Sequence, residues 1–304
     1  MSVIDDLLQK TSRTFALAIP LLPEPTRHQV GIAYLLFRIA DTFEDAVLWR
    51  REQRLAALDR FVELLDQDPI AADALAADCL REPPSEHAGY RELLARMPLV
   101  LRDFGALPLA ARVAIRRHVA RSVDGMKQFV RRSDEQNRLV LLSVDELRGY
   151  CYSVAGIVGE MLTELYLLDR AELAPSGEEL RNRAAAFGEG LQLVNILKDA
   201  PRDAEEGRVY LPRGVDLRTI LDLGDRALTA AERYVELLRH AATDSGLIAF
   251  NAFIAGLARS NLRILSERGL GAKLSKGEVA LVAAEVAQTL APPVSTGIGL
   301  SSAE

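Results

Sequence analysis

Two pairs of aspartates with four-residue spacing are the residues of this chain best suited to chemistry: Asp41 with Asp45, and Asp199 with Asp203. Each pair ends a largely apolar run with helical periodicity. Residues i and i+4 of an α-helix lie on one face, roughly 6 Å apart along the axis, so each pair can present two carboxylates to one small volume. Two such helices facing each other would need cations, basic groups or water to compensate the charge. Mg²⁺ carrying a diphosphate fits this need, because it accepts carboxylate, water and phosphate oxygens together.

The surroundings of each pair argue against a solvated acidic stripe, which is the usual meaning of a single motif of this kind. Tyr34 and Arg38 extend the helical face of the first pair, and Gln192 and Asn195 extend that of the second. Both polar stripes cross helices whose other residues are mostly apolar. We therefore expect two largely buried helices whose polar faces need partners.

Basic side chains that could neutralise phosphate occur near both pairs: Arg13, Arg38, Lys198, Arg202 and Arg208. Arg38 is the strongest candidate because it shares a helical face with the first pair, where it can contact both carboxylate and phosphate. The four histidines have no metal-ligand spacing, so we expect no zinc site. The chain also lacks a glycine-rich phosphate loop of the Walker or Rossmann type, so nucleotide-dependent kinase chemistry has no support.

A third segment, 150–159, places glycines inside a predicted helix. Gly156 and Gly159 each cost about 1 kcal/mol relative to alanine, so small residues here should admit a close neighbour. One interpretation is a tight contact between helices, which glycines on a helix face often mark. The other is a wall that accommodates a bulky apolar ligand, with the hydroxyls of Tyr150 and Tyr152 beside it.

The elements that position these residues are predicted to be helices, because helical periodicity dominates and alternating strand patterns are nearly absent. Prolines divide the chain into segments. Four Ser/Thr-x-x-Glu capping boxes, at Ser143, Ser176, Thr229 and Ser275, predict the starts of later helices. We predict an all-α protein with helices, to within ~2–4 residues, at 26–47, 51–66, 70–80, 88–104, 108–132, 143–170, 176–200, 227–242, 246–268 and 275–290.

Composition excludes several classes of function. The 304 residues are 49% hydrophobic and 26% charged, which allows a large core. A net charge of −6 argues against a nucleic-acid partner, whose phosphates require a basic face. Two cysteines provide no disulfide framework and no secretion signal is visible, so we expect a cytoplasmic protein. No stretch reaches the ~18 uninterrupted apolar residues of a membrane span, so any membrane contact is expected to be peripheral.

Five motifs, in order and at similar spacing, resemble the squalene/phytoene synthase family over roughly residues 10 to 290. They are Ser12-Arg13-Thr14-Phe15, Tyr34-x-x-x-Arg38-x-x-Asp41-Thr-Phe-Glu-Asp45, Tyr150-Cys-Tyr-Ser-Val-Ala-Gly156, Gln192-Leu-Val-Asn195-Ile-Leu-Lys-Asp199-x-x-x-Asp203 and Gly207-Arg-Val-Tyr-Leu-Pro212. The resemblance implies the single-domain isoprenoid-synthase helical bundle around a central cavity, here over residues 1–290, with a flexible tail at 291–304. It also implies Mg²⁺ and the head-to-head joining of two prenyl diphosphates.

Carried over by motif, the resemblance assigns roles to individual residues. Asp41, Asp45, Asp199 and Asp203 would bind Mg²⁺ and diphosphate, directly or through water, with help from Asn195. Tyr150 matches a tyrosine assigned to cation handling or proton transfer. The substrate-binding set would be Ser12, Arg13, Phe15, Tyr34, Arg38, Gly156, Gln192, Asn195 and Lys198.

Two departures from the family pattern affect the second pair. Pro201 lies between Asp199 and Asp203, where it removes a helical amide and clashes with the carbonyl four residues earlier, so we expect the helix to kink or end there. Asp203 is then the least secure ligand. Arg202 and Lys198 also differ from common family residues, and lysine offers a point charge rather than a bidentate fork.

The motif Asp41-Thr-Phe-Glu-Asp45 resembles the form found in squalene synthases, which act on farnesyl diphosphate through a cyclopropylcarbinyl diphosphate and reduce the product with NADPH. Lys273 and Lys276 are similar to a basic segment used for NADPH, although they also overlap the Ser275 capping box and could simply begin a helix. The alternatives are phytoene or dehydrosqualene synthase, which need no NADPH, and a non-catalytic paralogue that binds prenyl diphosphate. The sequence leaves substrate chain length and oligomeric state open.

Overall fold

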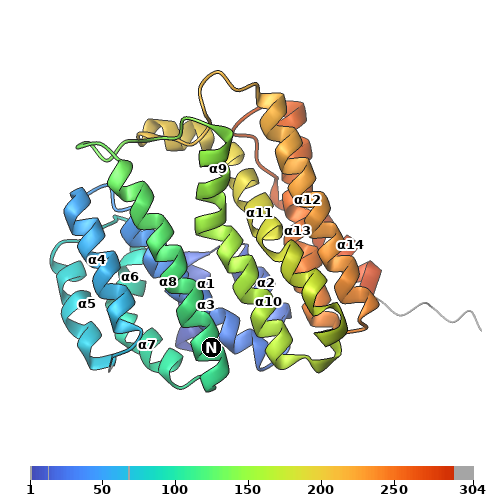
Figure 1. Cartoon of the computed structure of the whole chain (residues 1–304), viewed down its shortest axis with the longest axis horizontal. Coiled ribbons are helices and arrows are strands. Elements are labelled where there is room, and N and C mark those ends of the chain that lie inside the picture. Colours follow the sequence, from blue (N-terminus) through green and yellow to red (C-terminus); the bar gives the residue numbers. More distant parts are fainter. Residues whose placement is uncertain (1, 13, 68, 291–304) are drawn as a thin grey trace, which may run out of the picture.

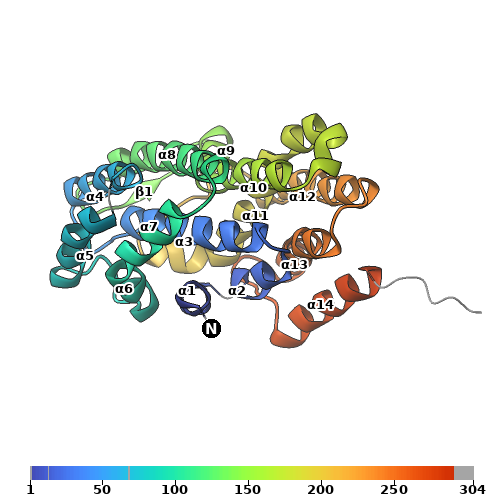
Figure 2. The same cartoon turned by 90° about the horizontal axis from the view of Figure 1, so that it is seen from below.

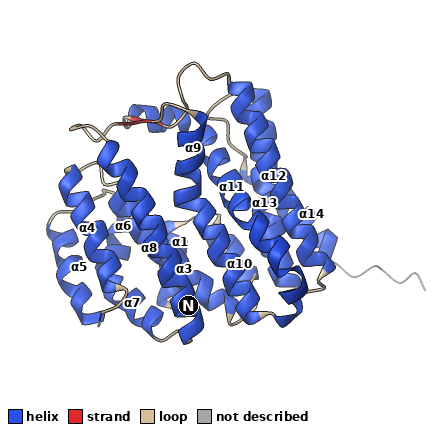
Figure 3. Cartoon of the chain, in the orientation of Figure 1, coloured by secondary structure: helices blue, strands red, loops and turns tan. Residues whose placement is uncertain are grey.

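The computed structural model describes residues 2–12, 14–67 and 69–290, so Arg13 and the predicted tail at 291–304 lie outside the described residues. Helices form nearly all of its regular structure (Figure 3), which confirms the all-α prediction. The α-helices are α1 (Val3–Thr11), α2 (Phe15–Ala18), α3 (Thr26–Glu44), α4 (Arg51–Leu64), α5 (Ala72–Arg81), α6 (Ala88–Ala95), α7 (Met97–Gly105), α8 (Leu109–Arg132), α9 (Val144–Cys151), α10 (Ile157–Asp169), α11 (Gly177–Glu205), α12 (Leu217–His240), α13 (Ser245–Arg268) and α14 (Lys276–Leu290). The shorter elements are the 3₁₀ helices η1 (Ile19–Leu21), η2 (Pro69–Ala71) and η4 (Ala171–Ser176), the π-helical segment η3 (Tyr152–Gly156), and the strands β1 (Leu139–Val140) and β2 (Arg208–Val209).

The helices form a layered bundle whose long members run roughly side by side (Figure 1). In the view from below, α8, α10 and α12 form the upper layer, α3, α11 and α13 form the middle, and α1, α2 and α14 cover the opposite side (Figure 2). Helix α11 packs against α10, α12 and α13, whereas α3 packs against α1, α4, α7 and α8. The two helices that carry the acid pairs are therefore both central.

A fully buried apolar face holds helix α3 in the core. Ile32, Leu35, Leu36 and Ile39 follow helical spacing and have no exposed surface. Burying a side chain of this kind contributes roughly 1.5–3 kcal/mol, so this face holds the helix firmly in the core. The helix ends at the first acid pair, where the N–H of Asp45 donates to the carbonyl of Asp41 at 2.8 Å.

The predicted end of the second acid-bearing helix at residue 200 is wrong, because α11 continues through Pro201 to Glu205. Proline leaves the carbonyl of Leu197 without its helical donor. The N–H of Gly271 supplies that donor at 3.2 Å, so a neighbouring loop compensates for the proline. Asp203 consequently stays on the same helix as Asp199.

Several other boundaries differ from prediction for local reasons. The predicted helix 88–104 is two helices, α6 and α7, separated at Arg96, whose φ of −99° and ψ of 11° leave the helical region. The stretch 143–170 is interrupted by the π-helical segment η3. Helix α12 starts at Leu217, with Asp216 as its cap, so the box at Thr229 lies inside a helix and its prediction is wrong. Helix α1, capped by Ser2, was not predicted.

The other three predicted capping boxes differ in how far they form. At Ser275 both hydrogen bonds with Glu278 are present, at 2.7 and 3.2 Å. At Ser143 only the hydroxyl acts as a cap, accepting from the amide of Glu146 at 3.1 Å. Ser176 precedes α11 without a side-chain cap.

A short parallel strand pair joins two distant loops beside the acid pairs. β1 pairs with β2 so that Leu139 lies opposite Arg208, and the N–H of Leu139 donates to the carbonyl of Gly207 at 3.2 Å. The positive φ of Gly207, 82°, allows the chain to turn directly after α11. The strand pair thereby returns Arg208 toward the C-terminal ends of α3 and α11.

One helical stretch, Val144–Asp169, is long and apolar enough to cross a membrane by length and composition alone. In the bundle, 56% of its apolar window is buried. Core helices of globular bundles have the same composition, so this stretch is weak evidence for a membrane span.

Candidate active site

Both acid pairs line a single cavity of about 290 Å³. Its walls come from the C-terminal ends of α3 and α11, from α9 with η3, and from β2 with the residue after it. The lining side chains are Arg38, Asp41, Glu44, Asp45, Tyr150, Val154, Gln192, Asn195, Ile196, Lys198, Asp199, Arg202, Asp203, Arg208 and Tyr210. The structure therefore brings together the four aspartates that the sequence predicted as one site.

The first pair carries a third carboxylate that the sequence analysis did not assign. Glu44 is 5% exposed and lines the cavity between Asp41 and Asp45. Burial, reinforced by the charges of those two aspartates, raises the pKa of Glu44 well above its ordinary value. Burial also raises the pKa of Asp41 to about 6, although the nearby guanidinium of Arg38 opposes the shift. Burial thus disfavours the charged form of both Glu44 and Asp41.

Basic side chains lie close to both carboxylates of the second pair, Asp199 and Asp203. Burial raises the pKa of Asp199, but the hydrogen bond from Lys273 and the charge of Lys198 outweigh it, so the pKa lies below its usual value. The Nζ of Lys273 is 2.8 Å from Oδ1 of Asp199. For Asp203, burial outweighs the attraction of Arg208, and the pKa is raised. Asp199 is therefore held as a carboxylate more firmly than Asp203.

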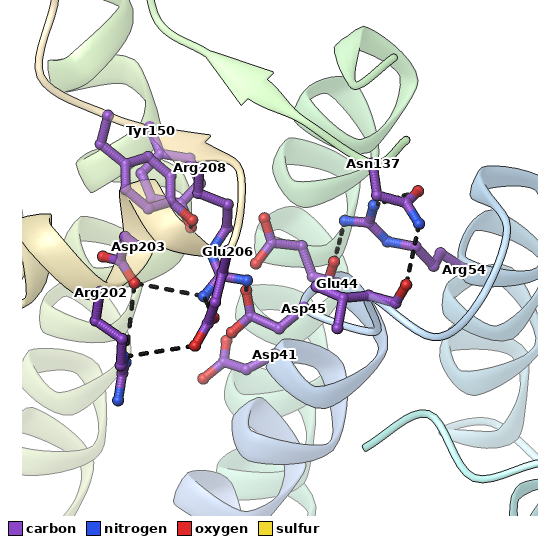
Figure 4. A network of polar contacts seen from close by, with 12 residues as sticks. Asp41, Glu44, Asp45, Arg54, Asn137, Tyr150, Arg202, Asp203, Glu206 and Arg208 are labelled. Atoms are coloured by element: carbon purple, nitrogen blue, oxygen red, sulfur yellow. Dashed lines mark hydrogen bonds and ion pairs between the residues drawn. The ribbon is translucent and has the colours of Figure 1, made fainter. Parts of the chain in front are cut away.

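Arg208 connects the two pairs (Figure 4). Its guanidinium lies 3.8 Å from Oδ1 of Asp45 on one side and 3.4 Å from Oδ1 of Asp203 on the other, and it also contacts Glu206. Burial lowers the pKa of Arg208, but the charges of these acids outweigh burial and raise it, so the side chain stays charged. Sequence analysis named Arg208 only as one basic candidate among several.

Arg38 extends from α3 into the cavity beside Asp41. Its guanidinium is 3.4 Å from Oδ2 of Asp41, donates to the hydroxyl of Tyr34 at 3.0 Å, and lies 5.6 Å from the ring centres of both Tyr34 and Tyr90. Within the part of the chain that the structure describes, its buried Nε has no hydrogen-bond partner. A buried donor without a partner costs about 1–3 kcal/mol, so an anionic ligand in the cavity would relieve this cost.

Three further predicted residues lie on α11 in the cavity wall. Gln192 and Asn195 precede Asp199 by about two turns and one turn, and Lys198 donates to Oδ1 of Asn195 at 2.9 Å. Lys198 also lies 3.6 Å from Oδ2 of Asp199. The second wall thus presents an amide oxygen, a lysine and two carboxylates.

Three predicted residues, Ser12, Phe15 and Tyr34, lie outside the cavity wall. The hydroxyl of Ser12 accepts a hydrogen bond from the amide of Phe15 at 2.9 Å. The ring of Phe15 packs against Tyr34 with centres 5.2 Å apart, and Tyr34 donates to the carbonyl of Thr11 at 3.3 Å. None of the three lines the 290 Å³ cavity, so their role in substrate binding stays a prediction.

Tyr150 reaches the cavity, whereas Tyr152 does not. The hydroxyl of Tyr150 donates to that of Tyr210 at 3.1 Å and the two rings stack 4.7 Å apart. Burial, together with the charge of Glu44, raises the pKa of Tyr150 well above its ordinary value, so its phenol keeps its proton. Tyr152 instead accepts a hydrogen bond from Arg121 at 2.6 Å. Tyr210 belongs to the motif that spans Gly207 to Pro212, but it was not predicted as a site residue.

The glycines of this segment serve close packing. A Cβ on Gly159 would lie 2.1 Å from the carbonyl oxygen of Ala184 on α11, and one on Gly156 would lie 2.8 Å from the ring of Tyr152. On the facing helix, a Cβ on Gly188 would lie 1.9 Å from the carbonyl oxygen of Ala155. The close-packing interpretation is confirmed, and the cavity wall at this point is Val154 rather than Gly156.

The two lysines predicted for NADPH lie in different surroundings. Lys273 contacts Asp199, as described above, and is 53% exposed. Lys276 is the first residue of α14 and is exposed. The structure thus places one of the two at the acid site and the other on the surface.

The donors present fit Mg²⁺ held together with a diphosphate rather than Mg²⁺ held by protein alone. Within the described ranges, no three His, Cys, Asp or Glu side chains are grouped so that they could hold a metal ion. Mg²⁺ usually keeps several waters and takes one or two carboxylates plus substrate phosphates. Asp41 with Asp45 on α3, and Asp199 with Asp203 on α11, supply such pairs in one cavity. Arg38 lines the same cavity, and its buried Nε has no hydrogen-bond partner among the described residues.

Comparison with known proteins identifies relatives of this arrangement. The family model described as squalene/phytoene synthase matches residues 8–266. Botryococcus squalene synthase from Botryococcus braunii is 29% identical over 79% of this chain and 48% of its own length. The human squalene synthase is 30% identical over 72% of this chain and 48% of its own length. This chain thus spans about half the length of the curated relatives it matches.

A solved structure of TcSQS with the ligand BPH1237 has the same fold. It superposes with a TM-score of 0.74 and 26% sequence identity, covering 94% of this chain and 88% of that one. The isoprenoid-synthase bundle expected from the motifs is therefore confirmed.

Proposed function

Because this chain belongs to the squalene/phytoene synthase family, we propose that it is a Mg²⁺-dependent prenyltransferase that joins two farnesyl diphosphates head to head. One observation carries the proposal: two central helices bring four aspartates to one cavity, namely Asp41, Asp45, Asp199 and Asp203. Arg38 lines the same cavity, and its Nε lacks a hydrogen-bond partner among the described residues. The squalene synthases among its relatives support the choice of farnesyl diphosphate.

The chain's own residues divide the work of binding. The basic groups of the cavity wall are Arg38, Lys198, Arg202 and Arg208, and they hold diphosphate oxygens by charge-assisted hydrogen bonds. The aspartate pairs and Asn195 hold the metal. When bound, Mg²⁺ would neutralise negative charge that develops on the departing diphosphate. Arg208 has a second task, because it lies between Asp45 and Asp203 and keeps the two walls together.

Departure of the diphosphate leaves an allylic carbocation, which must react before water reaches it in the cavity. Val154 and Ile196 are the apolar side chains in its wall, next to the paired rings of Tyr150 and Tyr210. The protonated phenol of Tyr150 can donate a hydrogen bond to a leaving oxygen, and its ring can face the cation. The double bond of the second farnesyl chain then attacks this cation and leaves a tertiary carbocation. Loss of a proton from C1 of that chain, which the released diphosphate can accept, closes the cyclopropane ring of presqualene diphosphate.

In the proposed second step, loss of diphosphate from presqualene diphosphate and hydride from NADPH give squalene. Lys273 and Lys276 remain the proposed NADPH contacts. One observation favours an alternative without reduction, phytoene or dehydrosqualene synthase: Lys273 already pairs with Asp199 rather than standing free for a cofactor. A non-catalytic paralogue that binds prenyl diphosphate is the third possibility.

The test is the mass of the product formed by the purified protein with Mg²⁺ and farnesyl or geranylgeranyl diphosphate, each with and without NADPH. We expect squalene from farnesyl diphosphate with NADPH. A C40 product from geranylgeranyl diphosphate alone would contradict the squalene proposal and favour phytoene synthase. Binding of either substrate with no release of diphosphate would identify the paralogue.

A further inference from the structure

The loop between α13 and α14 docks on α11 beside the second acid pair. Its Gly271 donates its N–H to the carbonyl oxygen of Leu197 at 3.2 Å. Gly271 has a φ of 85°, and a Cβ at this position would lie 2.9 Å from Cγ of Pro201. Glycine is therefore required here both by backbone conformation and by the close approach to the proline ring.

Pro201 creates the acceptor that this loop uses. In an uninterrupted helix the amide of residue 201 would donate to the carbonyl of Leu197, but proline has no N–H. A carbonyl freed inside a helix needs another donor, and Gly271 provides it. The proline between the two aspartates thus acts as an attachment point for a segment about seventy residues further along the chain.

Docking places Lys273 at the acid site. Ala272 and Leu274 pack against buried apolar residues, which fixes the backbone on either side of Lys273. The Nζ of Lys273 is 2.8 Å from Oδ1 of Asp199. The lysine side chain is 53% exposed while that of Asp199 is 20% exposed, so the ammonium can leave the carboxylate by rotating into solvent.

We propose that Lys273, positioned by the contact between Pro201 and Gly271, is a displaceable cation of the second acid pair. Without metal it holds Asp199 in place. When Mg²⁺ takes the same carboxylate oxygen, the ammonium moves to the diphosphate that arrives with the metal. This inference rests on the proposed function, since it requires a magnesium-bound diphosphate in the cavity.

Lys273 should weaken the binding of a divalent cation and strengthen the binding of diphosphate. Lys273 competes with a divalent cation for Asp199, because both need the same oxygen and their charges repel. Lys273 attracts diphosphate, because it adds positive charge next to it. A residue that only supported the fold would weaken the binding of both ligands when removed.

The test compares Lys273→Met with Arg268→Met. Arg268 lies at the end of α13 in the same segment, is 57% exposed and contacts Glu278 rather than the cavity, so it controls for the loss of one positive charge. Binding of Mn²⁺ alone is followed by electron paramagnetic resonance, and binding of inorganic pyrophosphate in saturating Mg²⁺ by calorimetry.

For Lys273→Met we expect Mn²⁺ to bind about three- to tenfold more tightly and pyrophosphate about three- to tenfold more weakly, the size of one part-exposed charged contact. Arg268→Met should leave both affinities near those of the wild type. Weaker binding of both ligands in Lys273→Met, or no change in either, would overturn the inference.

A second variant tests the attachment itself. Pro201→Ala restores an amide that can donate to the carbonyl of Leu197 and thereby displaces Gly271, while α11 remains helical. Hydrogen exchange at the amide of Gly271 should accelerate about tenfold or more, as for a lost hydrogen bond. Mn²⁺ affinity should rise as in Lys273→Met. Unchanged exchange together with unchanged Mn²⁺ affinity would contradict the role of Pro201.

The two proposals fail in distinguishable ways. If the wild-type protein binds no pyrophosphate in the presence of Mg²⁺, the proposed function is wrong and this inference falls with it. If the wild type binds pyrophosphate but Lys273→Met behaves as Arg268→Met does, the proposed function stands and the role of Lys273 is wrong.

Discussion

At the residue scale, the four aspartates share one cavity but not one charge state. Burial raises the pKa of Asp41 to about 6 and also raises that of Asp203. The pKa of Asp199 is lowered, because Lys273 and Lys198 outweigh its burial. Asp199 is thus ionised at a lower pH than Asp41, which is only about half ionised near pH 6.

Replacing one carboxylate in each pair should abolish most of the turnover without unfolding the protein. We expect Asp45→Asn and Asp199→Asn each to lower kcat about 100-fold or more, because each removes a ligand that acts on the departing charge. Stability should change by less than ~1 kcal/mol, since asparagine keeps the size of the side chain. Turnover of farnesyl diphosphate and urea unfolding measure the two effects.

The matched control for this pair of variants is Asp222→Asn. Asp222 is 52% exposed on α12, pairs with Arg218 and is not among the residues that line the cavity. Its variant should turn over farnesyl diphosphate at the wild-type rate. Wild-type rates in Asp45→Asn and Asp199→Asn as well would leave the metal assignment untenable.

Metal binding should depend on pH through Asp41. A carboxyl group binds Mg²⁺ only when it is deprotonated. Because the pKa of Asp41 is about 6, affinity should be constant above pH 7 and fall by up to about tenfold per unit below pH 6. Mn²⁺ titrations between pH 5 and 8 measure this fall, and Asp41→Asn should show a weaker pH dependence. A wild-type affinity that is flat down to pH 5 would contradict the assignment.

The sequence predicted the aspartates because their spacing is visible along the chain, but it missed residues whose function depends on their neighbours. Glu44 lies between Asp41 and Asp45 in the motif, yet its role follows only from its burial beside the cavity. Arg208 was predicted only as one of five basic candidates, and the strand pair that returns it to the site could not be foreseen from two residues on each side.

At the element scale, the end of α3 is held in place by α4 and the loop before β1. Arg54 on α4 donates to the carbonyl of Glu44 and, at 3.2 Å, to Oδ1 of Asn137 (Figure 4). Asn137, with a φ of 60°, donates in turn to the carbonyl of Trp49 at 2.7 Å. Three segments thereby fix the position of the first acid pair.

Removing Arg54 should therefore loosen the helix end as well as the site. In Arg54→Met we expect a loss of about 2–4 kcal/mol in the free energy of unfolding, because the carbonyl of Glu44 and the amide of Asn137 lose a buried charged partner. Turnover should fall together with Mn²⁺ affinity. Arg81→Met, which removes a 76% exposed arginine paired with Asp78, should change neither. Equal stability of the two variants would show that this network does not hold α3.

Element type was predictable, and element ends were less so. The range predicted for α3, 26–47, differs from Thr26–Glu44 only at its end, since apolar periodicity is strong there. The end of α11 was misjudged because the donor that compensates Pro201 comes from Gly271, a tertiary contact without any local signal. The start of α12 was misjudged because Thr229 has capping-box spacing but lies mid-helix, where its hydroxyl donates to the carbonyl of Asp225.

At the scale of the whole molecule, the helices that carry the candidate site also pack in the core that stabilises the fold. α8 packs against α10, and His118 is buried in that contact, 2.8 Å from the carbonyl of Ala114 and 3.7 Å from Glu164. Burial lowers the pKa of His118 despite both partners. The folded protein therefore keeps this imidazole neutral to a lower pH than the unfolded chain does.

Because of His118, the free energy of unfolding should decrease as the pH is lowered. Below pH 6.5 the unfolded chain binds a proton at this residue that the folded protein does not, so acidification favours unfolding, by at most about 1.4 kcal/mol per unit. We expect the stability advantage of the wild type over His118→Gln to shrink from pH 8 to pH 5.5 in urea unfolding. An advantage that stays constant or grows would contradict the neutral, buried imidazole.

The central claim is that α3 and α11 face each other across a cavity that binds a metal-bound diphosphate. The most direct measurement is a crystal structure with Mn²⁺ and inorganic pyrophosphate, with the metal located by anomalous scattering. We predict manganese between the pairs Asp41/Asp45 and Asp199/Asp203, with pyrophosphate oxygens at Arg38. Manganese and pyrophosphate bound elsewhere, with these four carboxylates uninvolved, would contradict the claim.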